Sequence, residues 1–198
     1  MNMSLWEILG FVFGLLSVWL TTRQSVWCWP TGILNVVFFA VMFYQAKLYA
    51  DVGLMGVYFV LSIYGWYHWS RPRSGVRGAA RGSANARTDR TELAVTRMPL
   101  WGWPVALLVL VGGTFVLGSA LSRTDAAFPW VDSGTTVASL IAQTLLTRKV
   151  LENWLVWIAA DVVMIGLYFQ KELYLTSGLY VVFIGLCVRG FVSWRKPV

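Results

Sequence analysis

Long apolar runs separated by short polar breaks are the dominant pattern of this chain. Runs long enough to span a bilayer lie near residues 4–22, 27–46, 52–69, 99–121, 133–147, 154–170 and 176–194. The fifth run is short and contains Ser133, Thr136 and Gln143, so six helices and one interfacial segment are an alternative to seven. The pattern predicts an all-α integral membrane protein with seven transmembrane helices, whose first helix is retained rather than cleaved as a signal peptide.

Composition supports the membrane class and excludes several others. Of the 198 residues, 58% are hydrophobic and 13% are charged, whereas a soluble domain has about 25% charged residues. Cys28, Cys187 and the single His68 have neither the spacing of a disulfide framework nor that of metal ligands. No nucleotide-binding motif and no nucleophile–base constellation is visible. We therefore predict no metal, no cofactor and no catalytic residue.

The basic residues gather on one predicted side of the membrane. Only Lys47, Arg123 and Lys171 fall on the opposite side, and Arg189 lies inside the last run. Cytoplasmic loops are enriched in Lys and Arg, so the N-terminus is predicted outside and the C-terminus in the cytoplasm. The net charge of +7 is assigned to topology, and no nucleic-acid partner is predicted. The twelve residues on the basic side are Arg23, Arg71, Arg73, Arg77, Arg81, Arg87, Arg90, Arg97, Arg148, Lys149, Arg195 and Lys196.

The chain repeats itself with an offset of 125 residues. Between positions 45 and 69, nine of 25 residues are identical to those 125 positions later. Each repeat holds three predicted helices, and the unpaired fourth run returns the second repeat to the orientation of the first. Such a 3+1+3 arrangement of parallel repeats is typical of transporters. The predicted parts are repeat 1–70, an Arg-rich cytoplasmic loop 71–98, a linker helix 99–122, and the second repeat with the C-terminus, 123–198.

An acidic side chain in the sixth run marks a candidate binding site. A charge near the bilayer centre costs roughly 2.5–3.5 kcal/mol, so Asp161 indicates function. Trp154, Trp157 and Asp161 are spaced by three and four residues and share one helix face, which Tyr168 continues. Asn153 is a further candidate beside them. Such a face suits a flat, cationic aromatic ligand.

The second run contributes a matching polar face. Trp27, Thr31 and Asn35 are spaced by four residues, and Gln143 on the polar fifth run is a further ligand candidate. Three alternatives remain open: the tryptophans, Trp29 and Trp154 included, form an interfacial belt, Asn35 bonds a neighbouring helix, or Asp161 pairs with Arg189. The candidate substrate-binding residues are Trp27, Thr31, Asn35, Gln143, Asn153, Trp154, Trp157, Asp161 and Tyr168.

Three stretches resemble the PnuC-type vitamin transporters, which include nicotinamide riboside transporters and relatives assigned to thiamine. They are WPTGILNVVFFAVMFYQAKLYAD, VYFVLSIYGWYHW and LLTRKVLENWLVWIAADVVMIGLYFQKELYLTSGLY. The resemblance implies a fold like that of SWEET sugar transporters, a place in the bacterial inner membrane among membrane lipid, and a homotrimer. It also implies facilitated diffusion, with the substrate trapped by a cytoplasmic kinase.

Nicotinamide riboside is the leading predicted substrate. Its pyridinium would stack on Trp154 or Trp157 near Asp161, and its ribose hydroxyls would meet Asn35 and Gln143. Many riboside members have Asn in place of Asp161 and Gln in place of Met55, so thiamine or another flat vitamin is the alternative. A third hypothesis is a non-transporting membrane subunit that presents the arginine loop to a partner.

Overall fold

Seven helices make up the computed structural model, which describes residues 5–45, 49–71, 93–124, 128–170 and 174–195. Each has 18 to 22 residues and rises about 27–33 Å, close to the thickness of a bilayer core of about 30 Å. The described residues contain no strand apart from an isolated bridge. The helices are α1 (Leu5–Thr22), α2 (Cys28–Gln45), α3 (Tyr49–Ser70), α4 (Gly102–Leu121), α5 (Pro129–Thr147), α6 (Asn153–Gln170) and α7 (Tyr174–Arg195).

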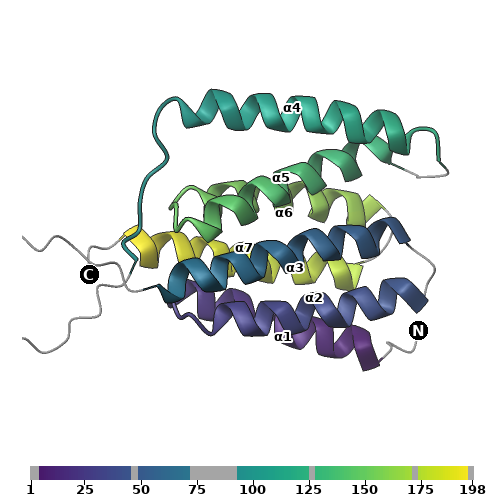
Figure 1. The fold of residues 1–198 in the computed structure, drawn as a ribbon. Coiled ribbons are helices and arrows are strands. Elements are labelled where there is room, and N and C mark those ends of the chain that lie inside the picture. The colour runs from purple at the N-terminus through teal and green to yellow at the C-terminus, as the bar shows by residue number, and fades with distance from the viewer. Residues whose placement is uncertain (1–4, 46–48, 72–92, 125–127, 171–173, 196–198) are drawn as a thin grey trace, which may run out of the picture.

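Six of these helices form a closed ring. Helix α2 packs between α1 and α3, and α6 packs between α5 and α7. The two groups join where α1 meets α7 and where α3 meets α5, so the ring order is α1, α2, α3, α5, α6, α7 (Figure 1). Helix α4 lies outside the ring against α5. The ring therefore has two seams, and each seam joins one three-helix group to the other.

Large apolar side chains cover the outer surface. On α4, Leu108, Phe115 and Val116 are 65% to 73% exposed, a pattern that suits contact with lipid. Four helix segments are long and apolar enough to span a membrane by composition, in α2, α4, α6 and α7. Helices α3 and α5 are not among the four, and they contact each other at one seam of the ring. Protein contacts there replace part of the lipid contact, so polar residues are tolerated.

The bounds of the helices repeat with the sequence offset. Adding 125 to the bounds of α2 and α3 gives those of α6 and α7, and α1 matches α5 to within one residue. The backbone repeats as well, because Gln24 and Lys149 have positive φ values of 56° and 55° at equivalent positions. Both follow the end of a helix, where a left-handed residue commonly stops it. The two three-helix groups therefore repeat in local structure as well as in sequence.

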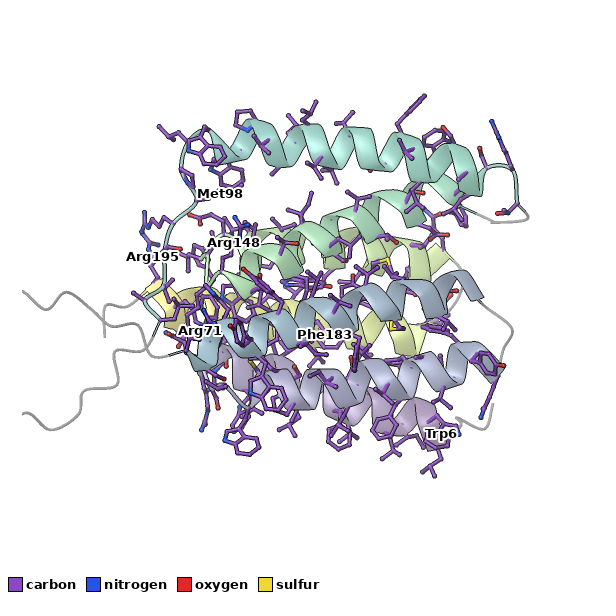
Figure 2. The ribbon with its side chains drawn as sticks, in the orientation of Figure 1. Trp6, Arg71, Met98, Arg148, Phe183 and Arg195 are labelled. Atoms are coloured by element: carbon purple, nitrogen blue, oxygen red, sulfur yellow. The ribbon has the colours of Figure 1, made fainter. Side chains whose placement is uncertain are left out.

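One end of the bundle carries most of the described cations. Helices α1, α3, α5 and α7 end there, and Figure 2 shows Arg71, Arg148 and Arg195 together at this end. We call it the basic end. Among described residues, Arg123 follows α4 at the opposite end. Most arginines of the predicted loop, and both Lys47 and Lys171, lie outside the described residues.

Four tryptophans, Trp29, Trp69, Trp154 and Trp194, fill the ring at the basic end, and we call them the tryptophan cluster. Each is at most 7% exposed. The rings of Trp29 and Trp69 meet edge to face at 5.3 Å, as do those of Trp154 and Trp194, and Trp69 meets Trp194 at 5.9 Å. Such geometry is favourable for aromatic pairs. The cluster joins the two repeats through their equivalent side chains.

Hydrogen bonds to the opposite repeat hold the cluster in place. Trp69 Nε1 donates to the Thr147 carbonyl at 3.2 Å, and Trp194 Nε1 donates to the Thr21 carbonyl at 3.0 Å. These carbonyls belong to the last turns of α5 and α1, where backbone acceptors lack helical partners. Each repeat therefore caps a helix end of the other.

Residues 93–98 form a strap across the turn between α5 and α6. Thr96 N donates to the Lys149 carbonyl at 3.0 Å, and Leu151 N donates to the Thr96 carbonyl at 2.9 Å. The sequence predicted an Arg-rich loop over 71–98. The last six residues of that range pair through their backbone with the chain between the two helices.

The strap also reaches the tryptophan cluster. Lys149 is 2% exposed, its Nζ donates to the Leu93 carbonyl at 2.8 Å, and the ammonium lies 4.8 Å from the Trp69 ring centroid. Met98 N donates to Glu152 Oε2 at 2.8 Å. The strap is thus anchored by backbone, charge and aromatic contacts.

Candidate functional site

A cavity of about 590 Å³ lies inside the ring, lined by all six of its helices. It begins at the tryptophan cluster, where Trp29 and Trp154 line it. It extends to Phe43 and Tyr168 in the last turns of α2 and α6. A volume of this size is typical of small-molecule sites. The cavity is therefore the candidate site.

Seven of the nine residues predicted from the sequence line this cavity. They are Asn35, Gln143, Asn153, Trp154, Trp157, Asp161 and Tyr168. The face of α6 was predicted from helical spacing, and the structure turns that face toward the cavity. Their contact with a substrate stays a prediction.

Asp161 is the acidic group of the cavity. It is 6% exposed, and its Oδ2 accepts a weak hydrogen bond from the Cys187 thiol of α7, with the two atoms 3.9 Å apart. Arg189 is exposed on α7, and no ion pair between Asp161 and Arg189 occurs in the described structure. The predicted alternative of a structural ion pair was therefore wrong. Asp161 faces the cavity without a cationic partner from the described lining.

Asn35 lies at the cavity wall and also bonds a neighbouring helix. It lines the cavity, and its Nδ2 donates to the Gly10 carbonyl of α1 at 2.8 Å. A Cβ added at Gly14 would lie 2.9 Å from this Nδ2, so the glycine leaves room for the amide. The hydrogen bond fixes the Asn35 side chain at the cavity wall.

Trp27 and Thr31 do not line the cavity. Trp27 precedes α2 and is 71% exposed. Thr31 Oγ1 donates to the carbonyls of Trp27, just before α2, and of Cys28, the first residue of α2. Spacing alone could not choose between neighbouring faces of α2. The face that meets the cavity contains Cys28 and Gly32 instead.

The belt interpretation of the tryptophans was also wrong for two of them. Trp29 and Trp154 are each 2% exposed. A Cβ at Gly65 would overlap the ring of Trp29, and a Cβ at Gly190 would lie 2.5 Å from Trp154 Cζ2. The two glycines occupy equivalent positions in α3 and α7, and each makes room for one indole.

Sequence reasoning missed the contribution of α3 and α7. Tyr58 and Ser62 of α3, and Phe183 and Cys187 of α7, line the cavity at positions 125 apart (Figure 2 labels Phe183, near the middle of the bundle). Tyr180 also lines it and stacks on Tyr168, with ring centroids 5.4 Å apart. The spacing of Tyr58 and Ser62 by four residues was the available signal.

The lining suits an uncharged or cationic organic molecule. Its described residues include one carboxylate, several aromatic rings and several neutral polar groups, and no Lys, Arg or His. Charges of like sign in a low-dielectric cavity repel strongly, so an anion is disfavoured next to Asp161. Within the described residues, no group of three acidic, Cys or His side chains could hold a metal ion.

Comparisons with known proteins agree with this architecture. The family described as nicotinamide mononucleotide transporter matches residues 4–196. The nicotinamide riboside transporter PnuC of Escherichia coli strain K12 is 28% identical, over 98% of this chain and 86% of the relative. The riboflavin/roseoflavin transporter RibM of Streptomyces davaonensis is 25% identical, over 95% and 83%.

A solved structure shares the fold. The crystal structure of the vitamin B3 transporter PnuC has a TM-score of 0.69 and 26% sequence identity, covering 95% of this chain and 79% of that one. A helical bundle with a cavity between two sequence repeats is compatible with a membrane carrier. The chain belongs to the nicotinamide mononucleotide transporter family, and the resemblance to PnuC-type transporters is confirmed.

Proposed function

We propose that this protein carries nicotinamide riboside across the membrane by facilitated diffusion. The observation that carries the proposal is Asp161, a buried carboxylate in a cavity whose described lining has no cation. The pyridinium ring of the riboside is a flat cation, and Asp161 supplies the opposite charge. Trp157, half-buried one turn before Asp161, offers a ring face. The similarity to a nicotinamide riboside transporter and to the vitamin B3 transporter PnuC supports this choice.

The same charge distribution supports trapping after transport. Phosphorylation turns the riboside into an anionic ester, and a cavity with one carboxylate and no described cation disfavours a phosphate. A cytoplasmic kinase therefore makes import irreversible without an ion gradient. The proposal has all seven helices crossing the membrane, as in SWEET transporters, with the basic end in the cytoplasm and the N-terminus outside. A homotrimer stays a prediction of the resemblance.

The tryptophan cluster is the barrier on the cytoplasmic side in this proposal. The cavity stops at Trp29 and Trp154 and extends toward the opposite end. Release of the riboside to the cytoplasm requires the cluster to separate, because its four rings fill the ring interior there. Alternating access then moves the repeats against each other at the two seams.

Transport into proteoliposomes tests the proposal. Purified protein is reconstituted without any ion gradient, and entry of radiolabelled nicotinamide riboside is measured against protein-free vesicles. We expect saturable entry that stops at equal concentrations inside and outside, and accelerated exchange when unlabelled riboside is preloaded. Absence of entry would contradict the proposed substrate, and entry only with a proton or sodium gradient would contradict facilitated diffusion.

A second candidate substrate is riboflavin, which the similarity to RibM favours. Riboflavin has no positive charge, so it leaves Asp161 without a counter-charge. Thiamine, the cationic alternative predicted from the sequence, retains that role for Asp161. Competition by unlabelled riboflavin and thiamine in the same vesicles separates the three vitamins. Nicotinamide riboside is expected to compete most strongly.

A further inference from the structure

Three buried polar atoms at the basic end of the cavity have no hydrogen-bond partner. They are Trp29 Nε1, Trp154 Nε1 and Asn153 Oδ1. Their side chains are 0% to 2% exposed, and all three residues line the cavity. An unpartnered buried polar group is costly, and native structures rarely leave one without a reason. Because the three residues line one cavity, a ligand in that cavity can complete the hydrogen bonds of these covered atoms when the surrounding side chains move.

The neighbouring tryptophans do have hydrogen-bond partners, so the missing hydrogen bonds of the described buried side chains are confined to these three atoms. The other two members of the tryptophan cluster, Trp69 and Trp194, both donate their indole N–H to a carbonyl. Asn153 uses its other amide atom, because Nδ2 donates to the Val150 carbonyl at 2.6 Å. That bond identifies the free atom as the acceptor Oδ1. The unsatisfied set therefore consists of two donors and one acceptor.

An alcohol has the complementary hydrogen-bonding capacity. A hydroxyl accepts through two lone pairs and donates one O–H, whereas a carboxylate or phosphate only accepts and an ammonium only donates. A phosphate ester would also place negative charge in a cavity whose described lining has Asp161 and no cation. The chemical class that fits is a neutral polyol, such as a sugar or sugar-alcohol substituent.

We propose that Trp29, Asn153 and Trp154 form a hydroxyl-binding subsite that fixes the orientation of the substrate in the cavity. This inference rests on the proposed function. Trp154 precedes Asp161 by seven residues on α6, about 10 Å along the helix axis. The hydroxyl-bearing end of the substrate lies toward the basic end and its charged ring lies toward Asp161. The ribose therefore contacts the tryptophan cluster, and it leaves the cavity ahead of the pyridinium ring when the cluster opens.

Four tryptophan-to-phenylalanine variants test the subsite, because the cluster contains its own matched controls. Trp29→Phe and Trp154→Phe remove an unpartnered N–H and keep an aromatic ring. Trp69→Phe and Trp194→Phe remove an N–H that is bonded to a carbonyl. Without ligand, we expect the first pair to keep or raise the melting temperature and the second pair to lower it. Equal losses in both pairs would show that a resident water or another structural partner already satisfies the subsite, and would overturn the proposal.

Binding measurements complete the test with nicotinamide riboside and its 2′-, 3′- and 5′-deoxy analogues. We expect Trp29→Phe and Trp154→Phe to weaken riboside binding about three- to tenfold. At least one deoxy analogue should bind the parent protein as weakly as the riboside binds these two variants. The affinity for that analogue should not fall further in the variants. Trp69→Phe and Trp194→Phe leave the subsite intact, so these variants should keep the parent's preference for the riboside over that deoxy analogue. If the loss of affinity from the substitution and the loss from the missing hydroxyl are additive for all three analogues, the proposed subsite is wrong while the proposed function stands. If the parent does not bind the riboside, both fall.

Discussion

The two three-helix repeats share a scaffold and differ in the chemistry they present to the cavity. Positions that pack the scaffold are the same in both, as Trp29 and Trp154 show, each beside its glycine, Gly65 or Gly190. At other positions that line the cavity, the two repeats differ. Asp161 corresponds to Val36 and Trp157 corresponds to Gly32, and all four line the cavity.

The second repeat therefore supplies the charge and the large aromatic surface on the α6 side of the cavity. The first repeat places the smaller Gly32 and Val36 at the equivalent positions of α2. Its polar Asn35 corresponds to Ala160, which does not line the cavity. A repeat in which both halves were alike would enclose a symmetric cavity, which suits a symmetric ligand. The asymmetry between equivalent positions points to a ligand with one charged end. The shared packing positions stabilise the fold, and we expect the positions that differ between the repeats to set the substrate specificity.

The largest expected effect comes from the shared packing positions. Gly190→Ala would place a Cβ 2.5 Å from Trp154 Cζ2, and Gly65→Ala would overlap Trp29. Overpacking of this kind typically costs 1–3 kcal/mol, so we expect a loss of about 3 kcal/mol in stability from each. Thermal unfolding followed by tryptophan fluorescence measures it.

Gly185→Ala, on the same helix as Gly190, is the matched control. Nothing lies within 4 Å of a Cβ at that position. Removing a helical glycine there should stabilise the protein by up to about 1 kcal/mol. Equal behaviour of Gly185→Ala and Gly190→Ala would contradict the packing role of the indole.

A smaller effect is expected where the repeats differ. Trp157→Ala removes a ring face next to Asp161 and should weaken riboside binding by about 1–2 kcal/mol, since stacking and cation–π contact are lost together. Calorimetric titration measures this loss. Trp103→Ala on α4, where the indole is 45% exposed and outside the cavity, is the control and should bind like the parent. A loss shared by both variants would point to a general effect on folding.

At the basic end, the two repeats differ because the strap binds the turn between α5 and α6 of the second repeat. Glu152 accepts from Met98 N, and its equivalent in the first repeat is Trp27, which is exposed. Glu152→Gln should cost about 1 kcal/mol, because the acceptor keeps its shape and loses its charge. Limited proteolysis between residues 93 and 98 should become faster, while riboside affinity stays the same. Unchanged proteolysis would show that the charge does not hold the strap.

The smallest effects are expected from two residues that the sequence analysis predicted in the site but that do not line the cavity. Trp27→Ala and Thr31→Ala should each change riboside affinity by less than about 0.5 kcal/mol, since neither lines the cavity. The same titration measures them. A loss comparable to that of Trp157→Ala would restore both residues to the site.

The sequence predicted the architecture because two independent signals agreed. Hydropathy placed seven helices, and the offset of 125 residues predicted that their bounds repeat. The largest error was at the start of α5, predicted at residue 133 and observed at Pro129. That first turn carries Asp132 and lies near a seam, so hydropathy, which responds to contact with lipid, missed it.

The site was predicted well on α6 and poorly on α2 for a physical reason. On α6, Asp161 fixed which face is interior, because a charge avoids lipid. On α2, Asn35 did not show which of two neighbouring helix faces points into the ring. Only the packing of α2 against α1 and α3 decides this. The contribution of Cys187 could not be read from the sequence, because a small buried residue resembles a packing residue.

The most direct test of the account is the charge preference at Asp161. Nicotinamide riboside and its dihydro form have nearly the same shape, and only the oxidised form carries the positive charge. Calorimetric titration of both ligands into parent and Asp161→Asn should show that the parent favours the cation by about 1–3 kcal/mol and that the variant does not. The same preference in parent and variant would contradict Asp161 as the counter-charge of the substrate.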